Sequence, residues 1–277
     1  IAITDGIPEL VQLFDFQRTF AENLGALFAQ NSAYFRYAES ELRRNFRTPE
    51  TYSILLYGIA IGHNRISQLA EFSGFPQNKC DKYLKTLDKV GLLETVQRKD
   101  TAGHVRTHYY PKGGYWKTWF RYVFPSQGRC LKPFEGDSLQ QLASDIDRSI
   151  VAEYFKKICW KWMKKNYGDY YWDEILCFDD PKQQDVTVNG VRFDYVQETK
   201  DHTIYVKIWD DIREGFPKAE FQRIEAATTA VRPFYENIYF LFSAGRACNY
   251  VEQLRNLDTV SVVDLKSLLG QKNKELF

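Results

Sequence analysis

The chain has 277 residues, of which 44% are hydrophobic and 16% aromatic, and its formal net charge is +1. This length and apolar content allow one large domain or two smaller ones with apolar cores. The near-zero charge excludes a global attraction to nucleic acid or to membrane surfaces. No apolar run is long enough to span a bilayer and no signal peptide is evident, so we expect a cytoplasmic protein with no membrane partner. The chain begins with Ile1 rather than Met, which indicates a piece of a longer protein.

The cysteines and histidines do not predict a metal site. No two of the five cysteines have the CxxC spacing of a zinc site or a redox pair, and we interpret them as reduced structural thiols. His104 and His108 lie four residues apart, but in a predicted hairpin and without a nearby Cys or paired acid. The cysteines are Cys80, Cys130, Cys159, Cys177 and Cys248.

Residues 1–48 are predicted to form a helical segment, because apolar residues recur at helical spacing around Leu10 and again around Leu24. No pattern in this stretch indicates chemistry, and we interpret it as packing.

Residues 49–113 have the element order of a winged helix-turn-helix. Pro49 stands at the first position of a helix, and Gly74 and Gly91 are typical helix stops. Strand-like runs follow on both sides of a turn, so the pattern is three short helices and a β-hairpin. The expected helices span 49–62, 65–72 and 76–90, and the expected strands span 92–98 and 104–110.

The rest of the chain is predicted to form an aromatic helix and linker over 114–136, followed by an α/β domain over 137–277. The predicted order in that domain is a long helix, three strands, a helix, a strand, a helix, a strand and a closing helix. We therefore predict an α+β protein. The expected elements are 139–165, 170–178, 191–197, 203–209, 218–231, 237–242, 250–254, 260–263 and 265–269.

The third helix of the winged-helix segment separates apolar from basic residues. At about 100° per residue, Cys80, Leu84, Leu87 and Val90 share one face and the lysines fall on the opposite arc. From position 76 to position 121 there are ten Lys or Arg residues and four acids, a local net charge of +6. Lysines suit phosphate contacts, and amide side chains at the helix start suit base edges. The predicted DNA-binding residues are Gln77, Asn78, Lys79, Lys82, Lys85 and Lys89, with Lys99 and Arg106 on the hairpin.

Sequence segments in the same order resemble the C-terminal region of prokaryotic archaeal-type P-loop ATPases, which are AAA/STAND-like. The segment ILLYGIAIGHNRISQLAEFSGFPQNKCDKYLKTLDKVGLLE resembles their winged helix. Upstream, ITDGIPELVQLFD is similar to the end of their ATPase lid, and YYPKGGYWKTWFRYVFP to an aromatic-arginine signature. YFLFSAGRACNYVEQLRN and VSVVDLKSLL resemble the close of their C-terminal domain, which has a PD-(D/E)xK nuclease-like fold. The resemblance covers nearly all of the 277 residues.

This resemblance implies that the ATPase core lies upstream and that residues 1–48 are a remnant of its lid. No GxxxxGK[ST] phosphate loop is present. We therefore expect no cofactor in this chain, with ATP and Mg²⁺ bound only by the upstream core. The expected partners are double-stranded DNA, the chain's own ATPase core and a second copy of the chain.

The resemblance also implies a nuclease-like site that has degenerated. Such nucleases use two acids to hold Mg²⁺ and a lysine to orient the attacking water. Asp194 matches the acid and Lys207 matches the lysine, but Tyr205 stands where a glutamate is expected. Lys156 stands where a further acid of the first helix would fall. We therefore predict no catalytic residue with confidence, and interpret Asp194 and Lys207 as remnants that pair with each other or face solvent.

A literal E-x-K at Glu198-Thr199-Lys200 is interpreted as a solvated turn. Glu153 or Asp173 is the acid that would substitute in an active nuclease.

The leading hypothesis is a C-terminal accessory region that binds double-stranded DNA without cleaving it. One alternative is a regulatory module that docks on the ATPase core or on a second copy, with the aromatic segment buried. Another is a Mg²⁺-dependent nuclease, which requires a carboxylate other than Asp194 near Lys207. We interpret the clusters at 115–120 and 160–162 as packing rather than as platforms for base stacking.

Overall fold

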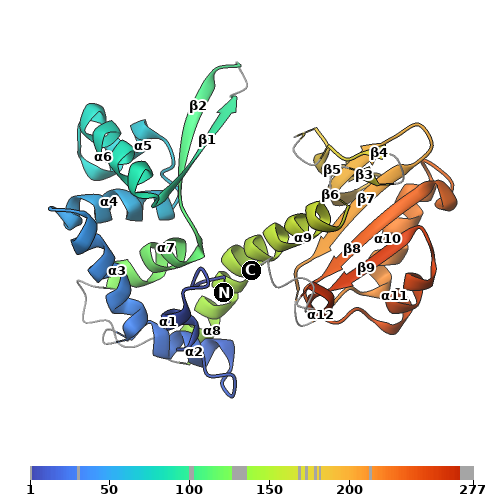
Figure 1. The fold of residues 1–277 in the computed structure, drawn as a ribbon, viewed down its shortest axis with the longest axis horizontal. Helices are drawn as coiled ribbons and strands as arrows, with labels where there is room; N and C mark the ends of the chain where they lie inside the picture. Colours follow the sequence, from blue (N-terminus) through green and yellow to red (C-terminus); the bar gives the residue numbers. More distant parts are fainter. Residues whose placement is uncertain are drawn as a thin grey trace. The chain divides into compact units, whose positions relative to one another are not determined.

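The computed structural model divides into two compact units, Ile1–Val151 and Ala152–Phe277 (Figure 1). Both helices and strands are present, and the protein is α+β, as the sequence predicts. No helix within the described ranges is both long and apolar enough to cross a bilayer. The structure describes residues 2–29, 32–99, 103–126, 136–167, 170–171, 174–177, 180, 182–211 and 214–268.

The first unit begins with three helices that pack through apolar faces. The helix α2 starts with a capping box, in which Thr19 and Glu22 satisfy each other's backbone N–H groups. Leu10 and Leu24 are buried in the core of this unit, as the helical spacing predicts. These helices are α1 (Pro8–Val11), α2 (Phe20–Leu27) and α3 (Ala33–Asn45).

The next part, Pro49–Pro111, is called the helix–hairpin segment below. Gly74 and Gly91 follow its second and third helices with φ angles of 71° and 81°, a left-handed conformation that glycine adopts without steric strain. The two strands pair in an antiparallel register that joins Leu93 to Pro111. The turn residues 100–102 lie outside the described residues. The elements are α4 (Pro49–Ala60), α5 (Ile66–Ser73), α6 (Gln77–Val90), β1 (Leu93–Lys99) and β2 (Val105–Pro111).

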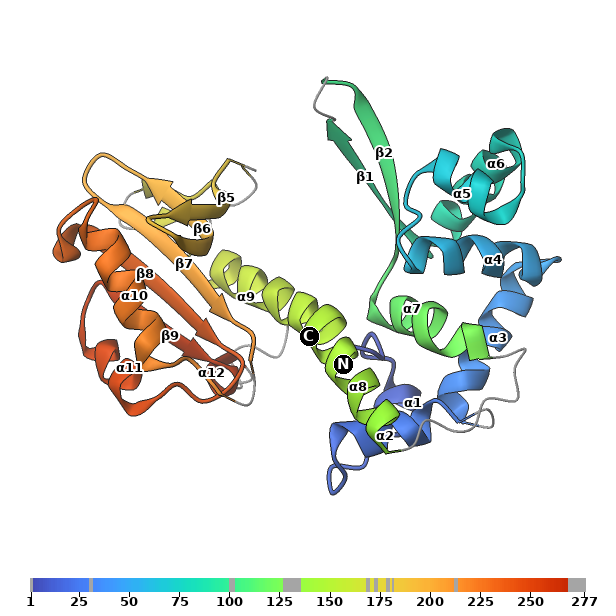
Figure 2. The same ribbon diagram turned by 180° about the vertical axis from the view of Figure 1, so that it is seen from behind.

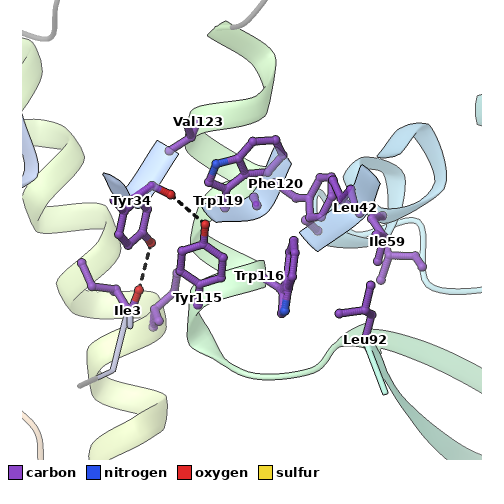
Figure 3. Packing of buried hydrophobic residues seen from close by; sticks show 14 of the residues in the cluster. Ile3, Tyr34, Leu42, Ile59, Leu92, Tyr115, Trp116, Trp119, Phe120 and Val123 are labelled. Atoms are coloured by element: carbon purple, nitrogen blue, oxygen red, sulfur yellow. Dashed lines mark hydrogen bonds between the residues drawn. The ribbon is translucent and has the colours of Figure 1, made fainter. Parts of the chain in front are cut away.

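The aromatic segment lies inside the first unit, where four of its rings are buried: Tyr115, Trp116, Trp119 and Phe120 (Figure 3). The Tyr115 hydroxyl donates to the carbonyl of Tyr34 at 2.8 Å, and the Tyr34 hydroxyl donates to the carbonyl of Ile3 at 2.9 Å (Figure 3). The interpretation as packing is confirmed for this cluster. Its elements are α7 (Gly114–Thr118), the π-helical turn η1 (Trp119–Val123) and the 3-10 turn η2 (Phe124–Ser126).

The start of α7 is held by a segment that is distant in sequence. Asp5 accepts hydrogen bonds from the backbone N–H groups of Gly114 at 2.6 Å and Tyr115 at 3.1 Å. A Cβ atom on Gly114 would lie 1.7 Å from the carbonyl oxygen of Ala2. Glycine is therefore required at this position for residues 2–5 to approach α7.

The long helix predicted over 139–165 is divided between the two units. Its first part is α8 (Asp137–Ile146) followed by the π-helical turn η3 (Asp147–Val151). Ile146 and Ile150 are buried in the core of the first unit. The boundary between units therefore lies after Val151 and not at residue 137, where the sequence analysis places the start of the α/β domain.

The second unit is built on a mixed sheet with the order β5-β6-β7-β8-β9. Within the described residues, β5, β6 and β7 are antiparallel neighbours, whereas β7, β8 and β9 run parallel. One face packs on α9 and the other on α10 and α11; Figure 2 shows α10 lying across the strands. The elements are α9 (Ala152–Tyr167), β5 (Gln184–Val188), β6 (Val191–Glu198), β7 (Thr203–Trp209), α10 (Lys218–Thr229), η4 (Phe234–Glu236), β8 (Asn237–Ser243), α11 (Asn249–Gln253), η5 (Leu254–Asn256), β9 (Val260–Asp264) and α12 (Leu265–Leu268).

One predicted strand of this unit is wrong. Among its described residues, the run 170–178 forms two short strands, β3 (Tyr170–Tyr171) and β4 (Glu174–Ile175), which pair with each other. The place beside β6 is taken by β5, an edge strand whose residues are exposed or only half-buried. Such a strand carries little apolar patterning, which explains why the sequence does not reveal it.

Candidate nucleic-acid interface and nuclease-like site

The helix α6 buries one face and exposes the other, as its sequence predicts. Cys80, Leu84 and Leu87 are buried against α4, α5 and the hairpin. Val90, expected on the same face, is 38% exposed because it is the last residue of the helix, next to Gly91. The opposite face is polar, and the side chains predicted there to bind DNA are all exposed: Gln77, Asn78, Lys79, Lys82, Lys85 and Lys89.

The lysines of α6 differ in their local contacts. The Lys79 ammonium lies 4.2 Å from the centre of the Phe75 ring, a cation–π contact that leaves its charge uncompensated. The Lys85 ammonium pairs with the Asp81 carboxylate at 2.7 Å, and this hydrogen bond raises the pKa of Lys85. Neither Lys82 nor Lys89 forms an ion pair with any described residue. Lys82 and Lys89 therefore present full positive charge.

The hairpin adds a second basic element to the same segment. Its strands extend beyond the helices α4 to α6 (Figures 1 and 2). Arg106 is exposed, and it is paired in register with Arg98, whose guanidinium lies 5.7 Å from the centre of the Tyr110 ring. Lys99 is the last residue of β1.

One of the two hairpin histidines, His108, contacts a polar side chain. The Nδ1 atom of His108 lies 3.2 Å from the Asn64 side-chain oxygen. In the ranges that the structure describes, no three His, Cys, Asp or Glu side chains are grouped closely enough to hold a metal ion.

In the second unit, Asp194 is held by two donors. Its Oδ1 accepts from the Lys156 ammonium at 2.6 Å, and its Oδ2 accepts from the backbone N–H of Ile208 at 2.7 Å. The Asp194 side chain is 11% exposed and the Lys156 side chain 38% exposed. Lys156 therefore compensates the charge of Asp194.

The hydrogen bond from the Ile208 N–H to Asp194 results from an irregularity in the strand β6. Phe193 packs on the α10 side of the sheet and Tyr195 on the α9 side, although two positions along a strand normally share a face. The β6–β7 ladder runs only as far as Tyr195 paired with Val206. The Ile208 N–H of β7 lies beyond the end of this ladder, and the Asp194 side chain accepts its hydrogen bond in place of a backbone carbonyl of β6.

Lys207 has a different set of partners. Its ammonium donates to the carbonyl of Arg192 at 2.6 Å and lies 3.4 Å from the Glu220 carboxylate on α10. The Glu220 side chain is 10% exposed, and its second oxygen accepts from Arg223 at 3.0 Å. The expectation that Asp194 and Lys207 pair with each other or face solvent is wrong, because each is paired elsewhere.

Glu220 is the residue of this region that the sequence analysis misses. It is a carboxylate other than Asp194 that approaches Lys207, so the proximity required of an active nuclease is present. However, Glu220 is compensated by two cations, and Asp194 by Lys156. The only sequence signal for Glu220 is a charged residue among the buried positions of a predicted helix.

The other nuclease-related residues that the structure describes form contacts of their own or face solvent. Tyr205 is buried on the α10 side and stacks with Tyr239. Glu198 and Lys200 are exposed beside the turn closed by Thr199 and the His202 carbonyl, which confirms the turn interpretation. Glu153 pairs with Lys157 at 3.3 Å on α9. Asp173 lies outside the described residues.

The aromatic clusters are placed inside the units. Tyr115, Trp119 and Phe120 are buried in the first core, so they are not available for base stacking or for docking on a partner. Trp160 and Trp162 are partly buried against the α9 side of the sheet.

Comparisons with known proteins give one weak similarity. The chain matches no protein-family model. It is similar to an uncharacterized protein, MJECL04, of Methanocaldococcus jannaschii, with 27% identity over 124 residues. The matched region is 44% of this chain and 28% of that protein, so the chain spans less than a third of the curated relative it matches.

Proposed function

We propose that the helix–hairpin segment binds double-stranded DNA without cleaving it. The observation that supports this most directly is the exposed face of α6, where Lys82 and Lys89 carry charges that no described acid compensates. In a chain with a net charge of +1, uncompensated cations gathered on one helix create a local attraction to phosphate.

The residues along α6 also suit two different kinds of DNA contact, with base edges and with phosphates. Gln77 and Asn78 occupy the first turn, where an amide side chain can reach a base edge in the major groove. The lysines that follow, and Arg106 on the hairpin, suit phosphate contacts that fix position without reading sequence. Binding is therefore expected to be mainly electrostatic.

The ion pairs of the second unit support the proposed absence of cleavage. Mg²⁺ chemistry needs free carboxylates, whereas Asp194 is bound by Lys156 and Glu220 by Lys207 and Arg223. We further propose that the chain is the C-terminal accessory region of a prokaryotic P-loop ATPase. Its partners would then include its own ATPase core, and a second copy if that core oligomerises.

The experiment is fluorescence anisotropy of a labelled duplex titrated with the chain across a salt series, with Mg²⁺ present. We expect affinity to fall steeply with salt and the duplex to remain intact. The double variant Lys82→Glu and Lys85→Glu should bind at least about tenfold more weakly, with a salt slope smaller by roughly 2.

The matched control is the double variant Lys182→Glu and Lys200→Glu, which makes the same charge change at exposed positions of the second unit. Circular dichroism would verify that both variants are folded. An equal loss in the control, or no loss in the α6 variant, would reject this face as the DNA contact. No binding even at low salt would favour the interaction-module alternative.

A further inference from the structure

A cavity of about 910 Å³ opens at the carboxyl ends of the parallel strands β8 and β9. It is lined by the residues that follow β8, by α11 and η5, and by the start of α12. In sheets with parallel strands, this edge is where ligands bind, and the volume lies in the range of small-molecule sites. Neither Asp194 nor Lys207 lines this cavity.

The loop that follows β8 is fixed by close backbone contacts. Gly215 has a φ of 66°, and a Cβ atom there would lie 2.0 Å from the carbonyl oxygen of Arg246. The Ala244 N–H donates to the Trp209 carbonyl at 2.8 Å, and the Cys248 N–H donates to the Phe216 carbonyl at 3.3 Å. Arg246 is therefore presented at the cavity by a loop that is anchored on both sides.

The two acids of the cavity wall share one ion-pair partner, Arg255. Arg255 pairs with Glu252 at 2.7 Å and with Asp264 at 3.5 Å. Asp264 also accepts hydrogen bonds from the Ser267 N–H at 2.7 Å and the Ser267 hydroxyl at 2.6 Å. One guanidinium compensates one of the two carboxylate charges, so with Arg246 and Lys266 the charged residues of the cavity wall sum to +1.

Two cations of the cavity wall have no ion-pair partner among the described residues. Arg246 and Lys266 are exposed and form no ion pair with the part of the chain that is described. Asn249 and Gln253 add amide donors to the lining. A guanidinium, an ammonium and neutral donors around one concavity match the oxygens of a phosphate group.

We propose that this cavity binds a small phosphate-bearing ligand, with Arg246 and Lys266 as its charged contacts. The ligand is a compact dianion or a nucleoside monophosphate, because the cavity is lined by three short segments of one unit and has the volume of a small-molecule site. This site is independent of the α6 surface and would remain if the chain did not bind DNA.

The test is calorimetric titration of the full chain with inorganic pyrophosphate and with adenosine monophosphate. We expect saturable binding by the unmodified chain with a dissociation constant below about 1 mM. Arg246→Ala and Lys266→Ala should each weaken it by about tenfold. The control Lys200→Ala removes an exposed lysine distant in sequence from the cavity lining, and should leave the dissociation constant unchanged.

Three outcomes would overturn the assignment. They are no heat from either probe, unchanged binding by both cavity variants, and an equal loss in the Lys200→Ala control. The same variants should also be assayed for duplex binding. Loss of duplex binding with Arg246→Ala would reassign the cavity to nucleic acid, whereas retained duplex binding supports a separate small-ligand site.

Discussion

The lysines of α6 and the lysines around Asp194 have opposite surroundings. Lys82 is exposed and forms no ion pair among the described residues. Lys207 is 16% exposed and is enclosed by the Arg192 carbonyl and the Glu220 carboxylate. An exposed lysine without an ion pair, such as Lys82, can attract a ligand. A largely buried lysine with partners, such as Lys207, stabilises the fold instead. The availability of a cation therefore depends on its neighbours rather than on its place in a motif.

Exposed and buried ion pairs also differ in how much they contribute to the free energy of folding. Exposed ion pairs contribute about 0–1 kcal/mol to folding, since solvent already stabilises both charges. Removing one member of a buried pair costs about 3–5 kcal/mol, because the remaining charge has no compensation. We therefore expect substitutions in the two regions to separate stability from binding.

The largest expected effect is on stability, at Glu220. Glu220→Ala should lower the free energy of unfolding by about 3 kcal/mol, because it leaves Lys207 largely buried without its carboxylate. Urea denaturation measures this loss. Lys82→Ala should change the same quantity by less than about 0.5 kcal/mol. Similar losses in the two variants would mean that the two groups of lysines do not differ as described.

A smaller effect is expected for DNA affinity at Asp81, whose carboxylate pairs with Lys85 at 2.7 Å. Asp81→Asn releases that lysine and should strengthen duplex binding by about threefold at low salt, with the gain vanishing as salt rises. Anisotropy titrations would measure it. Asp258→Asn makes the same charge change at an exposed position of the second unit and serves as the control. Weaker binding by the Asp81 variant would contradict the proposed contact.

The smallest effect is expected from Mg²⁺. Because Asp194 and Glu220 are both neutralised, millimolar Mg²⁺ should shift the midpoint of thermal unfolding by less than about 1 °C. Differential scanning calorimetry with and without the ion would show this. A saturable stabilisation by Mg²⁺ that disappears in Asp194→Asn would establish a metal site where the ion pairs predict none.

Local signals account for the parts of the fold that the sequence predicts. Gly74 and Gly91 stop their helices because the required left-handed backbone depends on one residue, and the lysine face of α6 follows from helical periodicity. The resemblance to a nuclease-like domain indicates Asp194 and Lys207, but it does not indicate the residues that pair with them. Lys156 and Glu220 lie on different helices, and their pairing with the strands depends on tertiary packing.

The predictions that were wrong also depend on tertiary packing, which local sequence patterns do not show. The strand β5 lies at the edge of the sheet and carries weak apolar alternation, so the sequence does not predict it, whereas the aromatic run 170–178 has the pattern of a strand. The boundary after Val151 depends on which core receives Ile146 and Ile150, and helical periodicity does not show this. The cavity beside Arg246 combines separate loops and helices that no local pattern connects.

The contact between residues 2–5 and α7 has a consequence for how related chains diverge. Asp5 caps the N–H group of Gly114 across 109 positions of sequence, and any side chain at Gly114 would collide with the Ala2 carbonyl. These positions should therefore vary together and not independently. In an alignment of relatives, we expect glycine at the Gly114 position wherever an acid is retained at Asp5, and loss of one to accompany loss of the other.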